Sequence, residues 1–230
     1  MEAIARGFVE ALGLLFRGDP GVREVLLLSL KVSGTALLFA TLIGIPLGAW
    51  LGFARFPGRR LVIALIYTGM GFPPVVIGLL VYLFLSRSGP LGFLGWLFNP
   101  PAMVLAQTII AFPLVAGFTM AAVIGVNPGL RQQLLSLGAT SWQATLALLR
   151  EARVGVVVSL VAGFGAIISE VGAVMMVGGN IEGHTRVLTT AIVQLTRMGA
   201  FAAAIALGLI LLALSFLVNL GMLRLQGRME

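Results

Sequence analysis

The chain has 230 residues, of which 59% are hydrophobic and 10% charged, against about 25% charged in an average soluble domain. This composition predicts an all-α integral membrane protein whose length is taken up by spans, without room for a second, soluble domain. The charge of +7 is spread over the ends of apolar runs rather than gathered in a patch, which argues against a nucleic-acid partner, and the absence of cysteine excludes disulfides and thiolate metal sites.

Residues 1–24 are predicted to form an amphipathic segment that lies on the membrane surface. Glu10 and Arg17 interrupt it, so it lacks the continuous apolar core of a signal peptide. Its apolar residues on one helical face are Ile4, Phe8, Ala11 and Leu15. We expect residues 25–225 to form the membrane domain and residues 226–230 a cytoplasmic tail.

Five apolar stretches are long enough to cross a bilayer, which takes about 20 residues. They are Val32–Ala54, Leu61–Ser86, Ala102–Val126, Val154–Val177 and Met198–Leu223. An odd number of spans places the two termini on opposite sides of the membrane.

The loops predict the orientation. The loop after the first span, the loop after the third span and the C-terminal tail together carry eight basic and two acidic residues. The opposite side carries seven basic and five acidic residues. The positive-inside rule therefore places the third loop and the C-terminus in the cytoplasm and the N-terminus outside.

Small residues and prolines mark special positions in the spans. Gly44, Gly48 and Gly52 follow each other at intervals of four, which lets helices approach closely. We expect them to pack inside the subunit rather than to form a dimer seam. Pro73 and Pro74, in the sequence GFPP, predict a kink that lines the pore, because broken backbone at membrane depth is tolerated where it lines a cavity.

The segment 128–153 is polar although a span lies on either side of it. It is predicted to form two short helices, Leu130–Leu137 and Trp142–Arg153, broken at Gly138, with Ser141 as the N-cap of the second. The apolar faces of these helices are expected at Leu130, Leu134 and Leu137, and at Leu146 and Leu149. A helix pair of this kind in water predicts a docking surface for another protein.

The chemistry of an enzyme is missing from the sequence. The chain has one histidine and one aspartate, and only one acidic residue lies within a span. Its only lysine, Lys31, follows Leu30, so there is no phosphate-binding G-x-x-x-x-G-K-[ST] loop. We therefore expect no catalytic residue, metal site or cofactor in this chain, and any nucleotide hydrolysis must come from another chain.

Glu170 is the one carboxylate in the apolar spans. Such a residue is a functional candidate by default. It follows Arg153 by 17 residues, or about 25 Å of helix, which places it near the outer edge of the bilayer. Both a role in transport and a simpler role, reaching water or pairing with Arg186 or Lys31, stay open.

The sequence from Gly178 to Arg197, on the predicted outer side, is the richest in polar groups. Hydroxyl, amide and guanidinium groups are the donors that bind an oxyanion. The candidates for the substrate path here are Asn180, Thr185, Arg186 and Thr189. The alternative is a solvated loop followed by an ordinary helix.

The polar segment resembles the EAA loop of ABC importer permeases. Gly138 stands at the place of the family's glycine, and Ala139, Ser141 and Trp142 match the usual continuation, whereas Gln132, Gln133 and Leu134 replace Glu-Ala-Ala. Three longer stretches are similar to the permease subunit of tungstate-type ABC importers: SLKVSGTALLFATLIGIPLGAWLGFARFPGRR, PPVVIGLLVYLFLSRSGPLG and ISEVGAVMMVGGNIEGHTRVLTTAI.

The resemblance implies a type I importer permease fold in the cytoplasmic membrane of a prokaryote. It implies a homodimer of five-span subunits with two ATPase subunits, which hold ATP and Mg. A periplasmic or lipid-anchored binding protein would deliver tungstate or molybdate. The expected ATPase-coupling residues are Leu137, Gly138, Ala139, Thr140, Ser141, Trp142 and Gln143.

The resulting hypothesis is alternating access driven by ATP on the partner chain. Two alternatives stay open. One is an ion-coupled secondary transporter that works without an ATPase, and the other is an ABC permease for another oxyanion such as sulfate.

Overall fold

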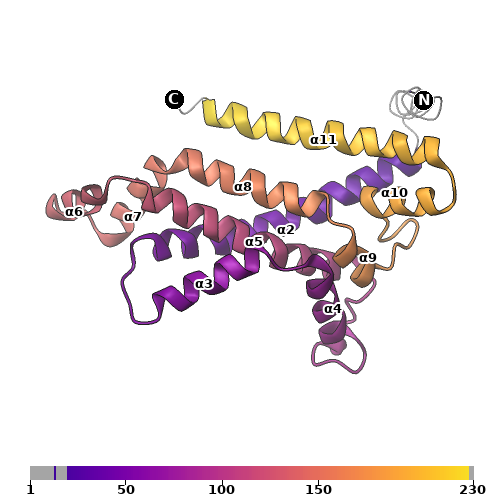
Figure 1. The fold of residues 1–230 in the computed structure, drawn as a ribbon, viewed down its shortest axis with the longest axis horizontal. Coiled ribbons are helices and arrows are strands. Elements are labelled where there is room, and N and C mark those ends of the chain that lie inside the picture. Colours follow the sequence, from indigo (N-terminus) through magenta and orange to yellow (C-terminus); the bar gives the residue numbers. More distant parts are fainter. Residues whose placement is uncertain (1–12, 14–19, 228–230) are drawn as a thin grey trace. The chain divides into compact units, whose positions relative to one another are not determined.

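A computed structural model describes Gly13 and residues 20–227 of the chain, and within them it shows helices and no strand. Most of the predicted N-terminal surface segment 1–24 lies outside the described residues. The elements in chain order (Figure 1) are α2 (Pro20–Phe53), α3 (Arg59–Met70), α4 (Pro74–Leu85), η1 (Gly92–Leu94), α5 (Pro100–Ile124), α6 (Pro128–Ser136), α7 (Ser141–Glu151), α8 (Arg153–Ile168), α9 (Gly172–Gly178), α10 (Leu188–Arg197) and α11 (Phe201–Gly227).

Three of the described helices, α2, α5 and α11, are long and apolar enough to cross a membrane. Two further pairs reach that length only across a break: α3 with α4, and α7 with α8, which are bent by 72°. The predicted span Leu61–Ser86 is therefore not one straight helix but two helices that meet at Gly71–Pro73, where the sequence predicted a kink. The predicted span Val154–Val177 is also divided, because α8 ends at Ile168 and α9 begins at Gly172.

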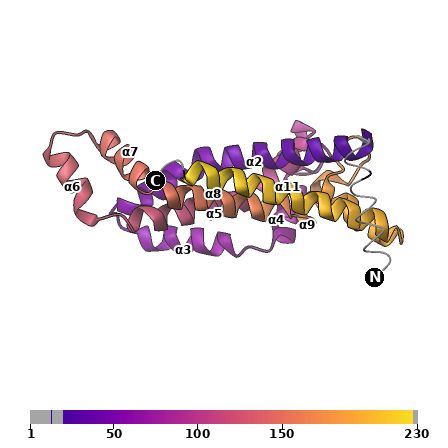
Figure 2. The ribbon, with the colours of Figure 1, turned by 90° about the horizontal axis from the view of Figure 1, so that it is seen from above.

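The residues form two compact units. Unit 1 consists of the described residues up to Ala36 together with Pro73–Gln107 and Ile167–Leu220. Unit 2 consists of Leu37–Phe72, Thr108–Ala166 and the described residues from Gly221 onward. Both views of the ribbon show α6 and α7, which belong to unit 2, as a helical hairpin (Figures 1 and 2).

Small residues hold α2 against α5 in unit 2. A Cβ added to Gly44 would lie 3.0 Å from Val115, one at Gly52 would lie 2.7 Å from Val123, and one at Gly48 would overlap the carbonyl oxygen of Ala116. The glycine face predicted to pack inside the subunit does so, because only a residue without a side chain allows this approach.

The core of unit 2 continues around that contact. Leu51, Ile66, Ala116 and Met120 form one buried cluster. This packing joins the end of α2 to α3 and α5, and so positions the chain that leads into the hairpin.

Unit 1 is held by tight packing and by buried hydrogen bonds. The amide of Leu188 donates to the Ser29 hydroxyl (2.9 Å), which ties α10 to α2. A Cβ on Gly78 would lie 2.6 Å from the Cα of Ala173, so α4 and α9 approach nearly to backbone contact. A larger residue at this glycine would push the two short helices apart.

Candidate functional site

The hairpin of unit 2 begins with a capped helix. The Asn127 side chain accepts a hydrogen bond from the amide of Gly129 (2.9 Å), and Pro128 occupies the first helical position of α6. Both residue types are favoured at these positions because the first amides of a helix lack partners within it. The helix therefore starts at a defined residue.

Gly138 ends α6 in a geometry that needs glycine. Its φ is +87°, and nothing lies within 4 Å of an added Cβ. The Gly138 amide donates to the carbonyl of Leu135 (3.1 Å), and the Ala139 amide donates to the carbonyl of Leu134 (3.0 Å). This pair of bonds is the Schellman arrangement of a helix C-terminus, which places a left-handed residue after the last turn. The predicted break at Gly138 is thus confirmed as a helix stop.

Thr140, and not the predicted Ser141, is the N-cap of α7. The Thr140 hydroxyl accepts from the Gln143 amide (3.2 Å), and the Gln143 side chain accepts from the Thr140 amide (2.8 Å). These reciprocal bonds form a capping box. Ser141 is the first helical residue and is exposed.

The apolar residues around this turn face outward. The Leu137 side chain is 84% exposed and Trp142 is 72% exposed, whereas Ala144 and Leu148 are buried. Leu137 and Leu146, on the predicted apolar faces of the two helices, are exposed, as a docking surface requires, and Leu148 takes the buried position on α7. Within α6, Leu130 and Leu134 are half-buried, as expected for a packing face.

The exposed turn brings the seven predicted coupling residues together. All of Leu137, Gly138, Thr140, Ser141, Trp142 and Gln143 are exposed, and Ala139 is half-buried. A short rigid turn that presents two large apolar side chains is suited to insertion into a groove of another protein.

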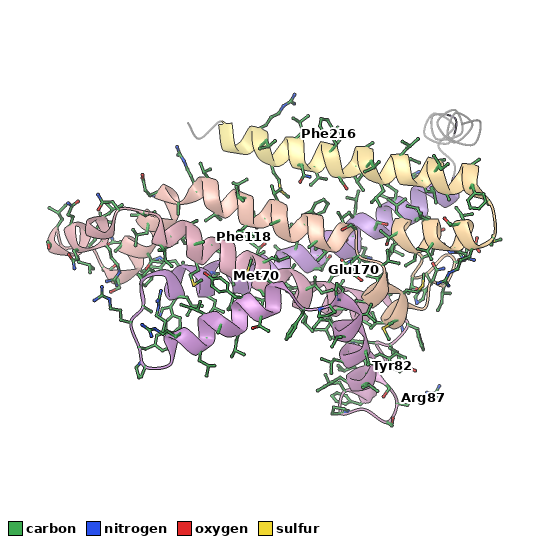
Figure 3. The ribbon with its side chains drawn as sticks, viewed as in Figure 1. Met70, Tyr82, Arg87, Phe118, Glu170 and Phe216 are labelled. Atoms are coloured by element: carbon green, nitrogen blue, oxygen red, sulfur yellow. The ribbon has the colours of Figure 1, made fainter. Side chains whose placement is uncertain are left out.

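Glu170 lies in unit 1 at the break between α8 and α9 (Figure 3). It is 9% exposed, and its Oε1 accepts a hydrogen bond from the Ala173 amide (2.8 Å) at the start of α9. Arg186, one of the two partners left open for Glu170, instead forms a salt bridge with Glu182 (3.0 Å). No salt bridge joins Glu170 to Lys31 within the described residues. Glu170 therefore holds the helix break in place.

Two threonines of the predicted substrate path are buried, and their hydroxyls bind backbone atoms within unit 1. The Thr189 hydroxyl donates to the carbonyl of Glu170 (2.9 Å), which joins α10 to the same break. The Thr185 hydroxyl donates to the carbonyl of Gly178 (2.6 Å) and accepts from the amide of Ile181 (2.9 Å). These two side chains fix the path of the backbone from α9 to α10.

The other two polar candidates keep unused hydrogen-bonding atoms. The Asn180 amide group donates to the Gln194 side chain (2.6 Å), while its Oδ1 is buried without a partner among the described residues. Arg186 is bound to Glu182, but its Nε is also buried and unpartnered in the described structure. A buried donor or acceptor without a partner costs free energy. These two residues therefore differ from the threonines in having polar atoms that a ligand could bind.

Pro73 and Pro74 start α4. Pro73, with an extended backbone, precedes the helix, and Pro74 is its first residue. Nearby in unit 1, a Cβ on Gly172 would lie 2.8 Å from the Cγ2 of Val75, so the first turn of α4 packs against the first turn of α9. The structure thus places two helix starts, each after an interruption of an apolar run, side by side.

No group of three or more metal-binding side chains occurs among the residues the structure describes. The one histidine, His184, is hydrogen-bonded to the Asn99 side chain (2.7 Å).

The helix caps of the hairpin and the contact of Arg131 were not predicted from the sequence. Thr140 with Gln143 three residues later is a capping-box signal that was present in the sequence. Arg131 stacks over the ring of Phe53 at 4.9 Å. That contact joins residues far apart in the chain, and no local pattern indicates it.

The comparisons decide the family. Residues 44–230 match the family model described as "Binding-protein-dependent transport system inner membrane component". The chain belongs to this family. With its apolar helices, membership makes the chain a multi-pass membrane component.

Two curated relatives are similar along most of the chain. A tungstate uptake system permease protein, TupB, from Peptoclostridium acidaminophilum is 44% identical over 228 residues, which cover 98% of this chain and 99% of the relative. A probable anion ABC transporter permease protein from Haloferax volcanii is 47% identical over 196 residues, 83% of this chain and 84% of the relative.

A solved structure shares the fold. A chain from inward-facing conformations of the MetNI methionine ABC transporter matches with a TM-score of 0.73 at 23% identity, and the match covers 95% of this chain and 97% of that one. The predicted ABC importer permease fold is therefore confirmed at the level of the fold.

Proposed function

We propose that this chain is the membrane-spanning subunit of an ATP-driven importer for tungstate or a closely related oxyanion such as molybdate. The observation that carries the proposal is the exposed turn at Leu137–Gln143, in a chain 44% identical to a tungstate permease over nearly its full length. Two subunits, each with five spans, an outer N-terminus and a cytoplasmic C-terminus, form a homodimer. Two ATPase subunits hold ATP and Mg, and an external binding protein delivers the oxyanion.

The hairpin acts as the coupling element. Burying the exposed surface of Leu137 in a groove of the ATPase would stabilise the complex by about 1.5–3 kcal/mol, and the larger Trp142 side chain would add to this. The Schellman turn and the capping box hold both side chains on a backbone that cannot easily yield. Closure of the ATPase dimer then moves the hairpin as one body, and the helices connected to it move as well.

The polar cluster of unit 1 consists of Glu170, Asn180, Thr185, Arg186 and Thr189. Some of these side chains hold the backbone in place, and one is a candidate ligand of the oxyanion. The side chains of Glu170, Thr185 and Thr189 each form a hydrogen bond with the backbone, so they position the segment between α8 and α10. Arg186 keeps an unpartnered Nε and a cationic charge that suits an oxyanion. We assign Arg186 to the oxyanion path, together with Asn180 on the same loop. The start of α4, at Pro73 and Pro74, forms part of the wall of this path.

The direct test is Trp142→Ala in cells that express the whole transporter. Oxyanion uptake should fall to background, and the ATPase subunit should no longer co-purify with the permease, while membrane insertion stays normal. The matched control is Trp96→Ala, which removes another exposed tryptophan that belongs to unit 1. ATPase co-purification at the wild-type level from Trp142→Ala would contradict the proposed coupling role.

The family match favours this function over an ion-coupled secondary transporter, since relatives of the family depend on a binding protein. Uptake that survives ATP depletion but stops with an uncoupler would reverse that preference. Competition among tungstate, molybdate and sulfate in the uptake assay ranks the substrate oxyanions.

A further inference from the structure

Unit 2 contains a cavity of about 660 Å³ that no step of the proposed transport uses. Residues from the ends of α2 and α5, the start of α3, α6 and α7 line it. Three of the lining residues are arginines: Arg55, Arg59 and Arg131. No acidic side chain lines the cavity.

The three arginines have few partners of their own. None of them forms a salt bridge with a described carboxylate. Arg59 donates from Nε (3.1 Å) and Nη2 (2.8 Å) to the carbonyl of Leu51, and so caps the end of α2. Arg131 lies over the Phe53 ring, and its Nε is buried without a partner among the described residues. Three cationic groups with unused donors around one cavity form a site for an anion.

Aromatic residues place this cavity at the border of the membrane. Trp50, one turn before the end of α2, is 45% exposed and stacks on Phe56 with 4.8 Å between the ring centroids. Exposed tryptophan at the end of an apolar helix is typical of the headgroup level of a bilayer. Ile124, which also lines the cavity, is 52% exposed and offers an apolar edge beside the charges.

We propose that the arginine cavity binds the phosphate group of an anionic membrane lipid. The guanidinium groups of Arg55 and Arg131 hold the phosphate, and Ile124 contacts the start of an acyl chain. This combination of cationic pocket and exposed apolar edge at headgroup depth fits a lipid better than a small free anion. Because Gln132 and Leu148 of the hairpin also line the cavity, a bound lipid would brace the hairpin against the end of α2.

The test measures lipid binding to the full-length permease, purified with its bound subunits and stripped of lipid by detergent exchange. Phosphatidylglycerol or phosphatidylcholine is added, and bound lipid is counted by native mass spectrometry. Wild type should bind one phosphatidylglycerol tightly and phosphatidylcholine weakly. Arg55→Gln and Arg131→Gln should each weaken that binding about fivefold, and the double variant about 25-fold.

The matched control is Arg60→Gln. Arg60, in the first turn of α3, follows Arg55 by five residues and carries the same charge, but it does not line the cavity. Its removal should change phosphatidylglycerol binding less than twofold. An equal loss in Arg60→Gln and Arg131→Gln would overturn the proposal, because it would show a general effect of surface charge.

Two further measurements distinguish a bound lipid from other occupants of the cavity. Inorganic phosphate and tungstate are titrated without lipid; binding of either that is lost in Arg131→Gln, with no specific lipid binding, would overturn the lipid in favour of a free oxyanion. If the double variant keeps phosphatidylglycerol but loses the ATPase subunit, the cavity serves an acidic side chain of that partner and the lipid proposal is overturned. These measurements do not depend on whether the chain transports tungstate.

Discussion

The hairpin of unit 2 and the polar cluster of unit 1 use side chains in opposite ways. Around Gly138 the backbone amides and carbonyls form hydrogen bonds with nearby backbone groups, and the large side chains Leu137 and Trp142 are exposed. Around Glu170 the side chains of Thr185 and Thr189 are buried and bind backbone atoms from other segments. Residues of the first kind are free to contact another molecule, whereas those of the second kind fix the shape of their own subunit.

The largest effect is expected at Gly138, where the comparison predicts loss of function without loss of fold. Gly138→Asp should reduce oxyanion uptake to background, because a non-glycine residue in this left-handed conformation costs about 1–2 kcal/mol and redirects the turn. Uptake and membrane insertion are measured together. Gly58→Asp is the control, since Gly58 has the same φ of +87° and open surroundings but lies outside the hairpin. Equal uptake by the two variants would contradict a special role for the hairpin.

Thr185 should show the opposite pattern, a loss of stability. Thr185→Val removes one donor and one acceptor from a side chain with 0% exposure, and should lower the free energy of unfolding by about 1–3 kcal/mol. Thermal unfolding in detergent measures this change. Thr196→Val, where the hydroxyl is exposed and binds only its own helix, should change stability by less than about 0.5 kcal/mol. Normal stability in Thr185→Val would show that the loop does not depend on this bond.

Arg186 tests the comparison within unit 1, because we assign it to binding the oxyanion rather than to holding the backbone in place. Arg186→Gln should raise the half-saturating oxyanion concentration for uptake about tenfold, because the variant loses one charge-assisted hydrogen bond to the oxyanion. The protein should unfold at nearly the same temperature, since the pair with the exposed Glu182 is worth about 0–1 kcal/mol. Glu182→Gln, which frees Arg186, is the companion variant and should not weaken uptake. Unchanged uptake kinetics in Arg186→Gln would remove this residue from the path.

The smallest effect concerns the cap of α7. Thr140→Ala should destabilise the hairpin by about 1 kcal/mol and partly uncouple ATP hydrolysis from uptake, because it removes the capping box. Ser141→Ala should change coupling less than Thr140→Ala, because Ser141 is not the cap. The ratio of ATP hydrolysed to oxyanion imported measures coupling, and a larger effect from Ser141→Ala would contradict the observed cap.

Local signals predicted the parts of the fold that depend on local chemistry. The glycines at 44, 48 and 52 predicted close packing of the first long helix, and GFPP predicted the break between α3 and α4. The fall in hydropathy after residue 126 predicted the hairpin and its turn. The caps were local errors: at α7, Thr140 and Ser141 are adjacent N-cap residue types, and Gln143 decides between them.

Features that depend on distant partners could not be predicted. The apolar run across residues 154–177 contains no proline, yet the helix stops at Ile168. The partner that binds the Glu170 carbonyl is Thr189, 19 residues later. Periodicity describes which face of a helix is apolar, but not which polar groups meet after folding.

The central claim is that the exposed turn of the hairpin docks into an ATPase subunit. The chain has no cysteine, so Leu137→Cys gives a single thiol that can carry a benzophenone crosslinker. Illumination of the assembled transporter should join this position to the ATPase chain, whereas Phe93→Cys, at another highly exposed site but in unit 1, should not reach it. Absence of the ATPase crosslink at position 137, or an equal crosslink at position 93, would contradict the account.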